Sequence, residues 1–165
     1  MSALRAVMPF FLVLLGAQRL ASQDSALKVG DRAPRVAVHD LAGKPVDLGQ
    51  YIGAKPVFLE FWATWCESCR ELQPRVRAAQ KAYGSQVEFI GINVAVNQSP
   101  GGVRQYLEAH EPGFRTLFDD EGTSTRAYRV PATSYVVIVD RSGQIVYTGI
   151  GGTQSFDRVL RQVSE

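Results

Sequence analysis

Residues 56–69, PVFLEFWATWCESC, hold a nearly continuous apolar run and both cysteines of the chain. The run is rich in aromatic and branched side chains, which is typical of a strand that is buried on both faces. Apolar residues then recur at three- and four-residue spacing, and this spacing predicts an amphipathic helix from about Cys66 to Tyr83. The sequence therefore places Cys66 and Cys69 at the start of a helix that follows a central strand.

The position of the two cysteines predicts thiol-disulfide exchange. Only the thiolate attacks a disulfide, and a free cysteine, with a pKa of about 8.5, is mostly protonated at neutral pH. A helix N-terminus stabilises the anion, so we expect Cys66 to be the nucleophile and Cys69 to resolve the mixed disulfide. A structural disulfide is the alternative, but so short a loop removes little chain entropy. We expect no cofactor besides this redox-active disulfide.

Glu60 interrupts the apolar strand six residues before Cys66. Strand alternation puts it on the same face as Phe58 and Trp62, so we expect a buried carboxyl group. Burial raises the pKa of a carboxyl group and suits Glu60 to take up and return the proton of the Cys69 thiol near neutral pH. The alternative is a glutamate that reaches solvent at an edge of the sheet, since buried glutamates are rare.

Trp65, Glu67 and Ser68 surround the cysteines and are expected to face the substrate. Trp65 offers an apolar contact surface next to the nucleophile, whereas Trp62 is expected in the core. Glu67, in the first helical turn, favours the helix but opposes a strongly lowered pKa of Cys66, which indicates a reductant or a moderate oxidant. The alternative role of Glu67 is helix stabilisation alone.

The rest of the chain alternates between strand and helix patterns. We expect a hairpin at 36–39 and 45–48, a core strand at 87–94, a helix at about 103–110, a short strand at 114–118, a short helix at 123–128, a hairpin at 135–139 and 145–148, and a closing helix at 156–163. Pro74 lies inside the long helix and is expected to kink it. This order predicts one α/β domain with a mixed central sheet and helices on both faces.

The first 22 residues have the composition of an export signal. Arg5 gives a positive start, and residues 6–17 form an apolar run of about twelve residues, shorter than the roughly 20 that span a bilayer. Ala21 and Ser22 offer a cleavage point, and an uncleaved N-terminal anchor is the alternative. Residues 23–165 then form the domain, periplasmic or secreted, with the membrane as a partner only if the segment is uncleaved.

The charge of the chain argues against one class of partner. The full chain has 18 Lys and Arg against 16 Asp and Glu, and removal of Arg5 and Arg19 leaves a formally neutral domain. Without a cluster of basic residues it has no electrostatic footprint for nucleic acid. We therefore expect the partners to be protein thiols or disulfides.

Several motifs together resemble the TlpA/ResA branch of thioredoxin-like proteins, over about residues 28–163. The active-site match is residues 61–69 (FWATWCESC) with Pro74 five residues after the second cysteine, and supporting matches are residues 30–34 (GDRAP), Tyr128 with Val130, and residues 140–145 (DRSGQI). The resemblance implies a thioredoxin fold with an N-terminal hairpin and a central insertion at about 97–123.

The resemblance also implies a function. It is that of an exported oxidoreductase that exchanges disulfides with protein thiols, often reducing the cysteines of apocytochrome c or metallochaperones during maturation, with an upstream membrane electron donor. Glu60 falls where thioredoxin carries its buried acid, which agrees with the argument from burial.

One position departs from the family pattern. The family carries a cis-proline that faces the cysteines, six residues before the aspartate that ends the strand, and counting back from Asp140 places Ser134 there. Alternatively, Pro131 is that proline and the next strand is three residues longer. A cis bond before a non-proline residue costs about 2.5 to 4 kcal/mol, so we expect the bond between Thr133 and Ser134 to be trans. Both residues are expected to line the substrate edge.

Two other functions remain open at this point. A peroxidase is one, because the domain resembles the wider family that includes peroxiredoxins, although Ala63 stands where their motif has Thr or Ser. A metal- or metallochaperone-binding module that uses both thiols is the other. A structural zinc site needs four ligands, and the chain adds His39 and His110 to the cysteines as candidates.

Overall fold

The computed structural model describes residues 26–112 and 114–165, and the expected export segment at 1–22 lies outside these residues. A seven-stranded sheet in the order β2-β1-β5-β4-β3-β6-β7 forms its centre. The strands are β1 (Ala37–His39), β2 (Pro45–Asp47), β3 (Val57–Trp62), β4 (Glu88–Asn93), β5 (Arg115–Phe118), β6 (Tyr135–Val139) and β7 (Ile145–Ile150). β3, β4 and β5 run parallel, whereas β6 and β7 are antiparallel additions, so the sheet is mixed as predicted.

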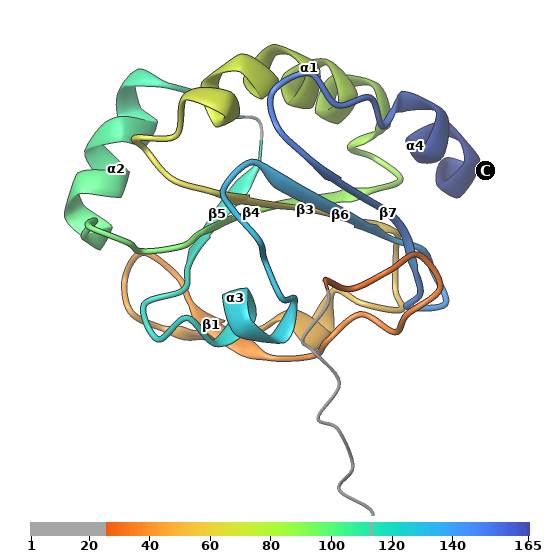
Figure 1. The fold of residues 1–165 in the computed structure, drawn as a ribbon, viewed down its shortest axis with the longest axis horizontal. Coiled ribbons are helices and arrows are strands. Elements are labelled where there is room, and N and C mark those ends of the chain that lie inside the picture. Colours follow the sequence, from red (N-terminus) through yellow and green to blue (C-terminus); the bar gives the residue numbers. More distant parts are fainter. Residues whose placement is uncertain (1–25, 113) are drawn as a thin grey trace, which may run out of the picture.

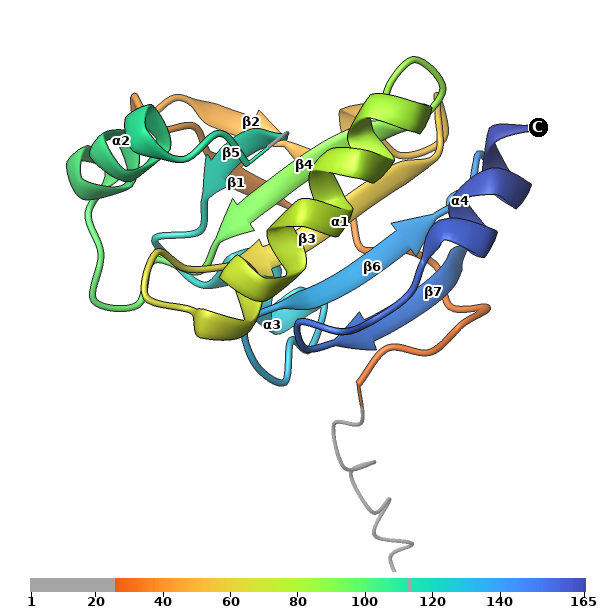
Figure 2. The same cartoon turned by 90° about the horizontal axis from the view of Figure 1, so that it is seen from above.

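Helices cover both faces of the sheet. α1 (Glu67–Tyr83), α2 (Pro100–Ala109) and α4 (Asp157–Ser164) lie on one face, and the short α3 (Thr123–Ala127) lies on the other (Figure 1). Seen from above, α1 crosses the middle of the sheet and α4 lies beside β7 (Figure 2). The predicted α/β architecture is therefore confirmed.

β3 is buried along its whole length because it lies at the centre of a sheet that is covered on both sides. Its odd-numbered residues, such as Leu59 and Phe61, pack into the cluster on the side of α3. Phe58 packs with Leu72 and Val76 of α1 on the other side. This alternation fixes which side chains of β3 face the start of α1.

The central insertion contains α2 and β5, and α2 begins three residues earlier than predicted. Ser99 caps the helix by accepting a hydrogen bond from the N–H of Gly102, and Pro100 occupies the first helical position, where its missing N–H is harmless. Gly101 and Gly102 made this stretch look like a loop in the sequence. The capping residues outweigh the low helix propensity of the two glycines.

α1 contains Pro74 and still continues as a single helix from Glu67 to Tyr83. Within the described residues, no helix combines the length and hydropathy that a membrane span requires.

Candidate active site

The two cysteines lie at the N-terminus of α1 and form a disulfide, with their Cα atoms 5.2 Å apart. Cys66 is the cap residue, and its Sγ accepts a hydrogen bond from the N–H of Cys69 over 3.1 Å. Ser68 Oγ lies 3.5 Å from the same sulfur. These groups, together with the helix dipole, would stabilise a thiolate at Cys66 after reduction. Both cysteines are buried, with 3% of the surface of Cys66 and 2% of that of Cys69 exposed. Their positions at the helix N-terminus, and not their exposure, therefore indicate which one is the nucleophile.

The loop after β4 supports the segment that precedes the cysteines. The N–H of Thr64 donates to Gln98 Oε1 and the indole Nε1 of Trp65 donates to the carbonyl of Val96, each over 2.9 Å. Gln98 in turn donates to the buried Asn93. These hydrogen bonds hold the Trp65 indole in place while half of its surface stays exposed, which suits it for contact with a partner.

Glu60 is fully buried, and neither of its carboxyl oxygens has a hydrogen-bond partner among the described residues. Phe58, two residues before it, packs under α1, and Trp62, two residues after it, clusters with both cysteines. Strand alternation therefore places the Glu60 carboxyl group on the α1 side of β3, between these two clusters.

The neighbouring strands enclose Glu60 with apolar groups. Its partners in register are Gly91 on β4 and Val136 on β6. The Phe114 ring covers Gly91 so closely that a Cβ there would lie 2.1 Å from it. Burial among these apolar groups removes water from the Glu60 carboxyl group and raises its pKa to about 8. The carboxyl group is therefore mostly protonated at pH 7 and exchanges its proton within the range where thiols titrate.

Glu67 is ion-paired with Arg70, one turn further along α1. The Glu67 carboxylate is largely exposed, so solvent and the guanidinium group both screen its charge from the disulfide. The expected opposition of Glu67 to a Cys66 thiolate is weakened by this pairing.

Ser134 stands directly before β6, and the bond that precedes it is trans, as are all peptide bonds of the described residues. Pro131, an exposed residue in the same loop, is therefore not a cis-proline. Ser134 instead has a left-handed backbone with φ of 60°. Its carbonyl accepts hydrogen bonds from the N–H of Gly151 over 3.1 Å and from Gln154 Nε2 over 3.0 Å. These two donors fix the backbone where the family pattern has a ring.

Trp65 and Thr133 both line an apolar hollow of about 500 Å³. Two loops contribute to it, one after β4 with Val94 and Val96, the other before β6 with Val130 and Thr133. These loops contain all four non-glycine residues of the described chain with positive φ: Ala95, Asn97, Arg129 and Ser134. Strained backbone of this kind gathers at functional sites, and here it flanks the tryptophan next to the nucleophile.

The sequence did not reveal several residues that shape this site. Gln98 and Gln154 support the cysteine segment and Ser134 through contacts over 34 and 20 residues of sequence, which no local pattern signals. Gln98 lies in the polar stretch from Asn97 to Gly102, whose composition predicts a loop and no particular contact. Distant hydrogen-bond partners of this kind become visible only in the fold.

Comparisons with known proteins agree with this geometry. The thiol-disulfide oxidoreductase ResA of Bacillus cereus is 28% identical over 142 residues, which cover 82% of this chain and 80% of that protein. The thiol:disulfide interchange protein DsbE of Chlorobium tepidum matches with a TM-score of 0.69 and 28% identity, over 83% of this chain and 95% of that one. A secreted disulfide oxidoreductase of Mycobacterium tuberculosis, homologous to E. coli DsbE, matches with a TM-score of 0.65 and 25% identity, over 79% and 95% of the two chains.

Fold, disulfide and relatives together define a thiol-disulfide oxidoreductase with a thioredoxin-like fold. The chain belongs to the Redoxin family, whose model matches residues 28–162. Within that family it falls in the branch of the ResA- and DsbE-like proteins, as the motifs around the cysteines predicted.

Proposed function

We propose that this protein reduces disulfides of other exported proteins, with the Cys-x-x-Cys-His segment of apocytochrome c as the substrate class. Cys66 acts as the nucleophile, Cys69 as the resolving thiol and Glu60 as the proton carrier. Trp65, Glu67, Ser68 and Thr133 form the surface that the substrate meets, and Ser134, whose side chain is fully buried, shapes this edge through its backbone. A membrane electron donor returns the disulfide to the dithiol form.

The reaction proceeds in two exchanges. In the first, the Cys66 thiolate attacks a substrate sulfur, a mixed disulfide forms, and the other substrate sulfur leaves as a thiolate that takes up a proton. In the second, ionised Glu60 takes the proton of the Cys69 thiol, and the Cys69 thiolate attacks Sγ of Cys66. The substrate leaves with two thiols, and the Cys66–Cys69 disulfide is restored.

The observation that carries these roles is the buried Glu60 carboxyl group without a partner, on the side of β3 that faces the start of α1. A carboxyl group without a hydrogen bond in an apolar site is costly, and such groups concentrate at functional sites. Its pKa of about 8 matches a proton exchange with a thiol better than an ordinary glutamate would.

The exported location rests on two observations. Residues 6–17 have the length and apolar character of a signal-peptide core. The similar protein of Mycobacterium tuberculosis is a secreted one. Protease accessibility of the full chain in cells whose outer envelope is permeabilised and whose inner membrane is intact tests the location, and a protein that is protected until the inner membrane is lysed would contradict it.

A peptide with an intramolecular Cys-x-x-Cys disulfide followed by His tests the substrate class. The reduced protein should reduce this peptide faster than a matched peptide with the same disulfide in an unrelated sequence. The Cys66→Ser variant should reduce neither. Equal rates for both peptides would contradict the proposed substrate class, and full activity of Cys66→Ser would contradict the mechanism.

A further inference from the structure

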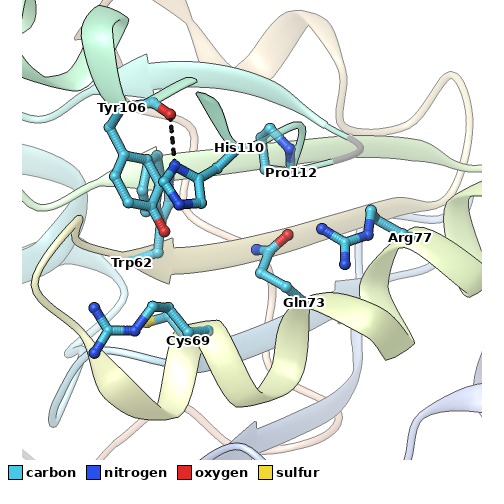
Figure 3. A pocket seen from close by; sticks show the side chains of 8 residues that line it. Trp62, Cys69, Gln73, Arg77, Tyr106, His110 and Pro112 are labelled. Carbon is cyan, nitrogen blue, oxygen red and sulfur yellow. Dashed lines mark hydrogen bonds between the residues drawn. The ribbon is translucent and has the colours of Figure 1, made fainter. Parts of the chain in front are cut away.

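A second opening reaches the disulfide from the side of α2. A cavity of about 180 Å³ lies between α1 and α2, and Cys69 forms part of its wall (Figure 3). Gln73 and Arg77 line it from α1. Tyr106 of α2 and His110, which directly follows α2, line the other side with their rings stacked 4.2 Å apart. Exchange at Cys66 does not require access to Cys69. Cys69 nevertheless borders a cavity that is separate from the surface around Trp65.

Two buried polar atoms of the cavity wall lack a hydrogen-bond partner among the described residues. One is the indole Nε1 of Trp62, a donor on a side chain that is 2% exposed. The other is Oε1 of Gln73, an acceptor on a side chain that rises from α1 toward α2 (Figure 3). Buried groups of this kind are normally satisfied, so this donor and acceptor indicate a polar ligand that supplies the complementary groups.

The charged groups around the cavity are mainly basic. Arg70 and Arg77 line it, and none of its described lining residues is acidic. Arg70 is engaged with Glu67. Arg77 donates one hydrogen bond, over 3.3 Å to the carbonyl of Glu111, and a guanidinium group has five N–H donors. Arg77 is therefore the cation available to a carboxylate in the cavity.

We propose that this cavity binds a low-molecular-weight thiol that carries a carboxylate and an N–H group, and that this thiol reduces the disulfide by attack on Cys69. The carboxylate pairs with Arg77, and the N–H group donates to Oε1 of Gln73. The volume suits a ligand of the size of a cysteine derivative. The proposal rests on the exchange chemistry of the Cys66–Cys69 pair and adds a second reductant, which does not use the protein-binding surface at Trp65.

Two molecules of the small thiol reduce the protein disulfide in two successive exchanges. The ligand thiolate attacks Sγ of Cys69, the Cys66–Cys69 bond breaks, and Cys66 leaves as a thiolate. A second thiolate of the same class attacks the ligand sulfur of the mixed disulfide on Cys69. The small symmetric disulfide departs, and Cys69 is released as a thiolate that takes up a proton. Two small thiols are oxidised, and the protein disulfide is reduced by two electrons.

The helix N-terminus favours attack at Cys69 over attack at Cys66. Exchange is faster when the departing sulfur is the more stable thiolate. The departing sulfur here is Cys66, which accepts the N–H of Cys69 over 3.1 Å and lies at the positive end of the α1 dipole. Attack at Cys66 would instead release Cys69, which lies three residues further along α1, where the helix dipole stabilises an anion less.

A matched pair of thiols tests the proposal on the full oxidised protein. N-acetylcysteine and N-acetylcysteine amide differ in the carboxylate alone, and their rates are compared per thiolate. We expect the acid to reduce the wild-type disulfide about fivefold faster than the amide, because only the acid can pair with the Arg77 guanidinium group. Arg77→Gln should lower this ratio to about one, and so should Gln73→Glu, which puts a negative charge in the cavity. The exposed Arg158→Gln, with the same loss of charge on α4, should keep the ratio.

The Cys66→Ser variant reports where the small thiol attaches. With the disulfide of N-acetylcysteine it should form an adduct on Cys69, detected by mass spectrometry, and Arg77→Gln in this background should slow the reaction. Equal rates for acid and amide on the wild type, or an unmodified Cys69, would overturn the proposal. If the proposal fails in this way but dithiothreitol reduces the same oxidised protein, the exchange chemistry of the Cys66–Cys69 pair still stands. A disulfide that neither dithiothreitol nor the small thiols reduce would overturn the proposed function as well.

Discussion

Glu60 and Trp62 lie on the same face of β3, and the polar atoms of both side chains lack hydrogen-bond partners among the described residues. Each buried unsatisfied group costs about 1–3 kcal/mol. The central strand of the sheet thus carries two destabilising groups directly under the helix that bears the cysteines. The proposed proton transfer accounts for Glu60, and the ligand proposed for the cavity beside Cys69 accounts for Trp62.

The thermal stability of the protein should depend on the ionisation of Glu60. Its pKa is about 8 in the folded state and about 4.5 in the unfolded chain. The stability that its protonated form provides is complete below pH 4.5 and is lost as the pH rises through 8, a change on the order of 5 kcal/mol. Glu60→Gln should therefore raise Tm relative to the wild type much more at pH 9 than at pH 5. The exposed Glu108→Gln is the control, and equal gains at both pH values would contradict a buried Glu60.

The second exchange should lose its inflection near pH 8 in the same variant. In the wild type the rate at which Cys69 releases the substrate should rise with pH, reach half of its maximum near pH 8 and level off above it, because Glu60 must be ionised to accept the proton. In Glu60→Gln the release should be about tenfold slower at pH 7, and the inflection should disappear. Stopped-flow fluorescence on a preformed mixed disulfide measures this step alone, and an unchanged profile would exclude Glu60 as the proton carrier.

Restoring the family proline should destabilise this protein. Ser134 has φ of 60°, whereas proline fixes φ near −65°, so Ser134→Pro should cost more than about 1 kcal/mol. Ser134→Gly should instead stabilise the fold by about 1 kcal/mol. Glycine accepts positive φ, and the substitution removes the serine hydroxyl, which is buried without a hydrogen-bond partner. Urea unfolding of both variants measures these differences. A proline variant as stable as the wild type would show that this backbone conformation is not required.

Gln154 should be needed for the shape of the loop before β6. Its Nε2 donates to the carbonyls of Ser134 and Gly151, and its Oε1 accepts from the Tyr147 hydroxyl. Gln154→Glu keeps the acceptor and removes both donated bonds, so it should lower the free energy of unfolding by about 1–3 kcal/mol. It should also raise KM for a protein disulfide, because the loop that it supports carries Thr133, which we propose to lie at the substrate edge. If Gln154→Glu leaves both the stability and KM unchanged, other contacts determine the shape of the loop.

Local sequence patterns predicted the elements that carry the chemistry. The helix that begins behind Cys66, the central strand and the buried position of Glu60 each follow from a period or a spacing within about ten residues. The position of Ser134 before β6 followed from counting back to Asp140, and the trans bond followed from the cost of a cis bond without proline.

Other features depend on contacts between distant segments. The support of Ser134 by Gln154, and that of Thr64 by Gln98, requires loops that meet only in the folded chain. The cavity beside Cys69 needs α2 to pack against α1, and the sequence placed the start of α2 too late because Gly101 and Gly102 resemble a loop. The ion pair of Glu67 with Arg70 is local, but the charge of Glu67 alone does not indicate that a guanidinium group screens it.

Trapping of the mixed disulfide tests the central claim most directly. Cys69→Ser removes the resolving thiol, so the full chain should accumulate one stable disulfide through Cys66 with a partner protein, resolved by diagonal electrophoresis and mass spectrometry. Cys66→Ser, which keeps the inner thiol alone, should trap no protein. The opposite pattern, or no trapped protein in either variant, would contradict exchange through Cys66 with resolution by Cys69.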